Sequence, residues 1–117
     1  MLLTSAFESA DPLSQVVFIL DYVQLRFQDM CLSLYSRLEM ETSRGVIART
    51  DRGFCDELVG LIGQRVASLD YRAKDQLRLR FEGGIVLVAS LHSADAVGEE
   101  LFQLTRSGHL SIVEQVA

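Results

Sequence analysis

LRLRFEGGIVLVASL, residues 77–91, decides the fold of this chain. Its first part alternates apolar and charged side chains, which is the period of a strand with one buried face. Gly83 and Gly84 follow, and glycine readily adopts the positive φ angles that a tight hairpin turn requires. The apolar run 85–91 is typical of a strand buried on both faces. The sequence therefore predicts a β-hairpin whose second strand is central in its sheet.

A similar pattern precedes it at residues 23–36, VQLRFQDMCLSLYS. Aligned without gaps, 23–36 and 77–90 are identical at four of 14 positions, Leu25/Leu79, Arg26/Arg80, Phe27/Phe81 and Ser36/Ser90. Either an old duplication or the shared composition of half-buried hairpins explains this likeness. The alternation predicts a second hairpin that turns at Asp29-Met30 and carries Cys31 on its apolar face.

The other elements are predicted from shorter signals. An apolar run at 16–20 has strand length, residues 46–48 suggest a short edge strand among charges, and 64–72 alternates like a strand. Phe54, Leu58 and Leu61 lie at helical spacing after Asp51, which can cap a helix, and this predicts a helix over 52–62 that ends before Gly63. No regular element is expected for residues 1–14.

The C-terminal part has weaker patterns. A second helix is expected after Ser93, with Val97, Leu101 and Leu104 on one face, although Gly98 disfavours it. Residues 109–116 fit a last strand or a short helix.

These elements predict a single α+β domain over residues 1–117. We expect an antiparallel sheet of about five or six strands, built from the two hairpins, with one or two helices packed on one face. One short helix would leave apolar sheet surface exposed, and either a second copy of the chain or the N-terminal segment could cover it.

Composition and charge exclude several classes of protein. The chain has 117 residues, 49% of them hydrophobic, and a net charge of −5. Nucleic acids and anionic membranes attract basic proteins, so neither is expected as a partner. Residues 1–14 contain no Lys or Arg, unlike a secretory signal, and two cysteines cannot form a disulfide framework. A cytoplasmic protein with reduced, buried Cys31 and Cys55 is the expectation.

Candidate chemistry is sparse in this sequence. His92, Asp95 and Glu99 have the spacing of a metal-binding stripe on a helix, and His109 could add a ligand. Acids in a first helical turn are favoured without any metal, so we predict neither a metal nor another cofactor. No nucleophile elbow or phosphate loop occurs, which argues against an enzyme.

Charged side chains offer two candidate surfaces. Basic residues on the two hairpins could share one sheet face, although Phe27 and Phe81, in phase with the leucines, should point inward rather than stack on bases. Acidic residues lie on both predicted helices and could form one negative patch that contacts a basic protein: Asp51, Asp56, Glu57, Asp95, Glu99 and Glu100. The basic residues concerned are Arg26, Arg37, Arg65, Arg78 and Arg80.

Three segments carry a resemblance to known proteins. They are DYVQLRF at 21–27, the pattern Asp51-x-Gly53-Phe54-x-Asp56-x-Leu58-x-x-Leu61-Ile62-Gly63, and Leu77-x-Leu79-x-Phe81-x-x-Gly84. Over about residues 22–101 the chain resembles small bacterial proteins similar to the immunity proteins of polymorphic or contact-dependent toxin systems. The resemblance implies a non-enzymatic cytoplasmic binding protein and transfers no functional residue.

We therefore expect a non-enzymatic protein-binding domain that binds and neutralises a cognate toxin, itself a basic protein. Two alternatives stay open. One is a domain that binds a small molecule or a metal through His92, Asp95 and His109, and the other is a structural homodimer subunit.

Overall fold

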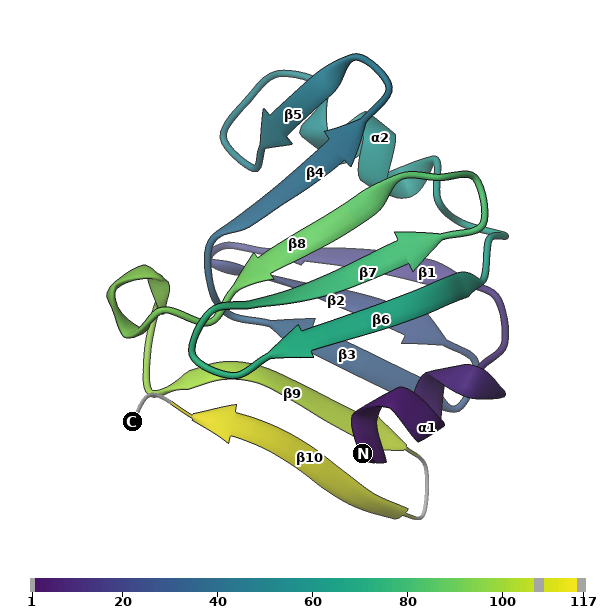
Figure 1. The fold of residues 1–117 in the computed structure, drawn as a ribbon, viewed down its shortest axis with the longest axis vertical. Helices are drawn as coiled ribbons and strands as arrows, with labels where there is room; N and C mark the ends of the chain where they lie inside the picture. Colours follow the sequence, from purple (N-terminus) through teal and green to yellow (C-terminus); the bar gives the residue numbers. More distant parts are fainter. Residues whose placement is uncertain (1, 107–108, 116–117) are drawn as a thin grey trace.

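The protein is a sandwich of two antiparallel sheets with five strands each (Figure 1). The computed structural model describes residues 2–106 and 109–115. The first sheet contains, in spatial order, β1 (Gln15–Ile19), β2 (Tyr22–Phe27), β3 (Met30–Leu34), β9 (Glu100–Arg106) and β10 (His109–Gln115). The second sheet contains β5 (Gly45–Ala48), β4 (Leu38–Thr42), β8 (Val86–Ser90), β7 (Gln76–Phe81) and β6 (Val66–Arg72).

The predicted α+β fold with one sheet is wrong. The two hairpins, β2–β3 and β7–β8, lie in different sheets, and each sheet covers the apolar face of the other. Helices α1 (Leu2–Glu8) and α2 (Phe54–Val59) are short and lie at opposite open sides of the sandwich (Figure 1). The surface that we expected a second copy or the N-terminus to cover is covered by the chain's own second sheet.

The inward side chains of both hairpins form one core. Leu25 and Phe27 from β2 and Leu79 and Phe81 from β7 are at most 1% exposed. This confirms the predicted phase of both alternating segments. β8 is central and buried on both faces, as the apolar run 85–91 predicted.

The turns of the two hairpins differ, and the difference changes the face of the strand on which Cys31 lies. Gly84 adopts the expected positive φ of 98°. In the first hairpin, however, the turn is Gln28-Asp29 rather than Asp29-Met30, and Met30 pairs with Phe27. A shift of one residue exchanges the two faces of a strand, so half-buried Cys31 points outward. Cys55 is exposed, and the prediction of two buried thiols is wrong.

The halves of the chain repeat one topology. Each runs from a helix through a three-stranded meander, β1-β2-β3 or β6-β7-β8, and then into two strands that cross to the other sheet. β4 therefore pairs with β8, and β9 pairs with β3. Backbone bonds from Leu13 N to Gln64 O (2.9 Å) and from Gly63 N to Leu13 O (2.7 Å) join the halves. Between the two explanations left open by the sequence, this topology favours duplication.

The predicted helices are only partly found. α2 is shorter than 52–62, and Asp51 accepts a hydrogen bond from Ala48 N (2.8 Å) instead of capping the helix. The second predicted helix is wrong: Ser93–Asp95 forms a single 3₁₀ turn, η1, and Leu101 and Leu104 lie on strand β9. The interior of the sandwich provides apolar strand partners there, which outweighs a weak helical pattern broken by Gly98.

Two elements were not predicted. Helix α1 falls in residues 1–14, where Leu3 and Phe7 are buried in the core. β4 was not predicted, although Leu38 and Met40 alternate with charged residues and are buried as in a strand with one buried face. The predicted edge strand at 46–48 is confirmed as β5, and the strands expected at 16–20 and 64–72 are β1 and β6. Of the two alternatives left open for 109–116, the strand is found, as β10.

Candidate functional site

The outer faces of the two sheets are the largest surfaces that no helix covers (Figure 1). Because the halves repeat, each position on one face has an equivalent on the other. One row of paired residues crosses all five strands of the first sheet: Val17, Gln24, Ser33, Gln103 and Val113. The equivalent row of the second sheet is Asp70, Arg78, Val88, Glu39 and Ala48. The first row carries no charge, and the second carries three.

The outer face of the first sheet, here called the uncharged face, continues this pattern. Gln24 Nε2 donates to Ser33 Oγ (3.2 Å), so two of its polar groups satisfy each other. Among the outward side chains that the structure describes on these five strands, Arg26 and Glu100 are charged, and the pairing register places them at opposite ends. The middle of the face presents amides, hydroxyls and valines.

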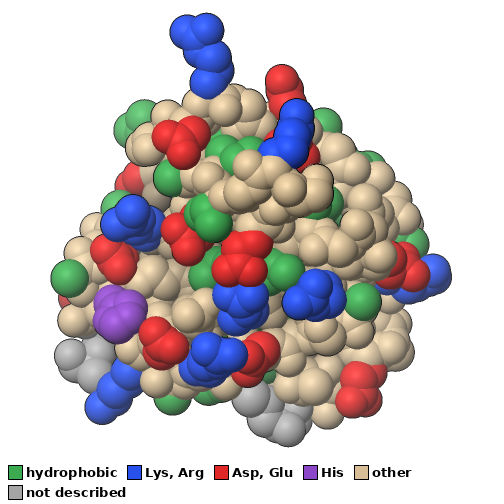
Figure 2. Space-filling view, turned by 45° about the horizontal axis from the view of Figure 1, so that its top comes forward, with side chains coloured by type: hydrophobic (Ala, Val, Ile, Leu, Met, Phe, Trp, Pro, Cys, Tyr) green, Lys and Arg blue, Asp and Glu red, His purple; other side chains and the backbone are tan. Residues whose placement is uncertain are grey.

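The outer face of the second sheet carries charged side chains, some of them in ion pairs, and Figure 2 shows acidic and basic side chains interspersed across it. Arg78 donates to both oxygens of Glu41, Nη1 to Oε2 (2.8 Å) and Nη2 to Oε1 (2.6 Å). This bond holds the pKa of Glu41 below its usual value, against the opposing effect of burial. Arg72 pairs with Asp70 at 2.9 Å. These charges satisfy each other within the chain.

The Glu41–Arg78 pair predicts a pH-dependent contribution to stability. A carboxyl whose pKa is lowered by folding stabilises the protein above its unfolded pKa, near 4.5, and loses that effect as pH falls through the folded pKa. We expect Glu41→Gln to lower the free energy of unfolding by about 0.5–1 kcal/mol at pH 7, since the pair is partly exposed. Urea unfolding at pH 7 and at pH 3 tests this, and a difference from wild type that persists unchanged at pH 3 would contradict it.

The arginines that could have shared one basic face lie on opposite sides of the molecule. Arg26 projects from the first sheet, whereas Arg78 and Arg80 project from the second. Phe27 and Phe81 are buried, as expected. These residues therefore do not form the shared basic face that the sequence allowed.

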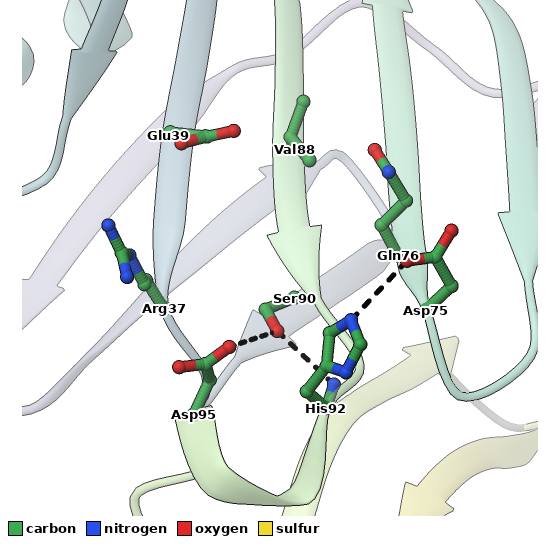
Figure 3. Close-up of a pocket in the computed structure, with 8 residues that line it drawn as sticks. All are labelled: Arg37, Glu39, Asp75, Gln76, Val88, Ser90, His92 and Asp95. Atoms are coloured by element: carbon green, nitrogen blue, oxygen red, sulfur yellow. Dashed lines mark hydrogen bonds and ion pairs between the residues drawn. The ribbon is translucent and has the colours of Figure 1, made fainter.

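Two of the hollows in the described residues occupy equivalent places in the two halves, where a meander meets the crossover strands, and others lie elsewhere on the molecule. The first, here called the histidine hollow, measures about 310 Å³ and lies over β4, β8 and the start of β7 (Figure 3). It is lined by Arg37, Glu39, Asp75, Gln76, Val88, Ser90, His92 and Asp95.

The polar groups of the histidine hollow bind one another. His92 Nε2 lies 3.3 Å from Asp75 Oδ1, and Ser90 Oγ donates to Asp95 Oδ2 (2.6 Å) (Figure 3). Ser90 Oγ also accepts the backbone N–H of His92 at 3.2 Å. The serine hydroxyl is thus directed at a carboxylate rather than at an imidazole, so these bonds do not form a serine–histidine–aspartate relay.

The second, here called the tyrosine hollow, measures about 530 Å³ and lies at one end of the uncharged face. It is lined by Asp21, Tyr22, Tyr35, Val97, Gly98, Glu99, Glu100 and Gln103. The rings of Tyr22 and Tyr35 pack with centroids 4.9 Å apart, and Tyr35 OH donates to Gln103 Oε1 at 3.4 Å. Segment 96–99 forms its wall because Val97 N donates to Tyr35 O (3.1 Å).

The six acidic residues expected in one patch are divided among three places. Glu99 and Glu100 line the tyrosine hollow, while Asp95 lines the histidine hollow. The remaining three, Asp51, Asp56 and Glu57, lie on and before α2 at the open side of the sandwich, where Glu57 pairs with Arg44. Sequence analysis missed Asp21, Tyr22 and Tyr35, whose only signal was that both tyrosines alternate out of phase with buried Val23 and Leu34.

The metal-binding stripe is not formed by the residues that the structure describes. His92 and Asp95 flank one hollow and Glu99 lines the other, because the helix that would have aligned them is absent. No group of three His, Cys, Asp or Glu residues that could hold a metal occurs in the described part of the chain. The side chain of His109 lies outside the described residues.

Comparison of the chain with protein-family models, curated proteins and solved structures found no match. None of the helices in the described residues is long and apolar enough to cross a membrane.

Proposed function

We propose that this protein is a non-enzymatic protein-binding domain that docks its partner on the uncharged face. The observation that carries the proposal is the contrast between the two equivalent rows. At the same places in a repeated fold, the second sheet has Asp70, Arg78 and Glu39, and the first has Val17, Gln24 and Gln103.

The composition of the uncharged face is that of an interface centre. Protein interfaces are depleted of Lys, Glu and Asp at their centre and enriched in tyrosine, because charges cost free energy when they lose water. Tyr22 and Tyr35 adjoin the row, and its two end members, Val17 and Val113, are partly exposed. A partner that covers this face would desolvate few charges.

Charge complementarity defines the partner as a protein with a basic contact surface. Three carboxylates, from Asp21, Glu99 and Glu100, line the end of the uncharged face. The net charge of −5 would also accelerate the encounter with a basic protein. The proposed role is that of an immunity protein, which neutralises a basic toxin domain by covering it.

A transplant of the charged row tests where the partner docks. Val17→Asp with Gln24→Arg places on the first sheet the two residue types that Asp70 and Arg78 present at the equivalent register of the second. The fold should tolerate the change, because both positions lie on the outer face and are partly exposed. We expect affinity for the partner to fall at least tenfold, because two charges would lose water in the interface.

The partner is first identified by photo-crosslinking in the cells that make the protein. A photoreactive amino acid in place of Val17 should yield an adduct with a second protein, and the same amino acid in place of Asp70, its equivalent, should not. Affinity for that protein is then measured for the transplant and for a matched control, Asp70→Asn with Arg78→Gln. If both variants bind the captured protein like wild type, the docking proposal is wrong. The toxin assignment is tested separately: if the captured protein causes no growth defect that co-expression of this chain relieves, that assignment is wrong.

A further inference from the structure

We infer that the tyrosine hollow receives an arginine or lysine side chain of the protein partner, seated against Tyr22 and Tyr35. This inference rests on the proposed function and names the chemical group that its site recognises. Three features of the hollow carry it: its unpaired carboxylates, its packed aromatic rings, and its counterpart in the other half of the chain.

The carboxylates of the tyrosine hollow have no salt-bridge partner among the described residues, although Arg49 Nη2 donates to the backbone oxygens of Ile19 (3.2 Å) and Tyr22 (3.4 Å), on either side of Asp21. No hydrogen bond or ion pair joins the side chains of Asp21, Glu99 or Glu100 to any residue that the structure describes, and no Lys, Arg or His lines this hollow. Three carboxylates line one concavity of about 530 Å³, which gives a cationic side chain several partners of opposite charge.

In the histidine hollow, the carboxylate equivalent to that of Asp21 lies beside a side chain that can carry a positive charge. Asp75 immediately precedes β7, as Asp21 immediately precedes β2. Asp75 lies 3.3 Å from the imidazole Nε2 of His92, so the chain itself supplies a group that is cationic when protonated. In the tyrosine hollow no such group is present among the described residues, and the partner's side chain would take its place.

The tyrosine pair favours a side-chain cation over a hydrated metal ion. Arginine and lysine stack on the faces of aromatic rings, and the guanidinium group can bond a carboxylate through two N–H groups at once. Tyr22 and Tyr35 both line the hollow, with ring centroids 4.9 Å apart. The amide of Gln103, held by Tyr35 OH, supplies a further polar contact.

The position of the hollow ties it to the docking face. Tyr22, on β2, and Tyr35, directly after the end of β3, lie next to the row of uncharged residues, and Gln103 belongs both to that row and to the hollow. A partner lying on the row would place its edge over the hollow. One basic side chain at that edge would anchor the complex and orient it.

The experiment uses a fluorescent tetra-arginine peptide as the probe, with tetra-citrulline as the uncharged control of similar shape. We expect the full chain to bind tetra-arginine and not tetra-citrulline. Glu99→Gln with Glu100→Gln should weaken binding at least tenfold. A matched variant, Asp11→Asn with Asp56→Asn, removes the same number of charges from exposed positions elsewhere and should change binding less than twofold.

Several results would overturn the inference. The first is absence of tetra-arginine binding. The second is equal weakening by both double variants, which would indicate an effect of net charge. The third is tighter binding of free spermidine than of the peptide, which would indicate a polyamine site. Tyr22→Leu provides a second measurement, expected to reduce tetra-arginine binding while the carboxylates remain.

The outcome is separable from that of the proposed function. Val17→Asp with Gln24→Arg leaves every residue of the tyrosine hollow in place, so it should retain tetra-arginine binding while losing the partner. Loss of peptide binding in Glu99→Gln with Glu100→Gln, together with full partner affinity, would reject the anchor and keep the docking face.

Discussion

Phe27→Ala is expected to lower the free energy of unfolding by about 3–5 kcal/mol, the range for removal of a buried phenylalanine. Phe27 is 0% exposed in the core between the two sheets. Its ring also packs edge-on against Phe7, with centroids 5.4 Å apart, and so connects α1 to β2. The truncation would leave a cavity that two hydrogen-bonded sheets cannot collapse to fill, since their spacing is set by all the other inward side chains.

Phe18→Ala is the matched control for this prediction. Phe18 lies on the same sheet at edge strand β1 and is 41% exposed, so the same change of side chain should cost about 1 kcal/mol or less. Urea unfolding monitored by circular dichroism measures both variants. Equal losses would show that the core does not lie between the sheets as described.

The second large effect is expected when the chain is divided between its halves. Fragments 1–50 and 51–117 should each fail to fold as a monomer, and a mixture of the two should give a folded 1:1 complex. In each fragment the crossing pair, β4–β5 or β9–β10, would lose the strand against which it pairs, because β4 bonds β8 and β9 bonds β3. The unpaired strand edges and the apolar faces would then be exposed to water.

Circular dichroism and light scattering on each fragment and on the mixture test this prediction. The duplicated topology also allows a fragment to pair with a second copy of itself, so homodimers of either fragment agree with the described fold. A fragment that folds as a stable monomer would contradict it.

Part of the candidate site was predictable from single residues and part was not. The contribution of Glu99 and Glu100 was predictable, because an exposed carboxylate can pair with a cation wherever it lies in the fold. Both residues were expected to contact a basic partner. Their neighbours were not predictable. Tyr22 and Tyr35 reach them because segment 96–99 folds back along β3 through the bond from Val97 N to Tyr35 O, which joins residues far apart in the chain. Asp56, on α2, lines neither hollow.

The sequence by itself determined the strands of the two hairpins and the inward phase of their first strands, but not strands β4 and β9 or the face on which Cys31 lies. Alternation along 77–81 and 23–27 placed Phe81 and Phe27 in the core, and the apolar run 85–91 made β8 a central strand. These properties follow from the period of two in a strand, which operates over a few neighbouring residues.

Only the tertiary structure decided that the two hairpins lie in different sheets. A half-apolar hairpin can bury its inward face against a helix or against another sheet, and its own residues do not distinguish these partners. The choice came from the crossings of β4 and β9, which depend on hydrogen bonds between strands about fifty residues or more apart. The same crossings created both hollows and left one outer face without charges along its central row, and the proposed function depends on that face.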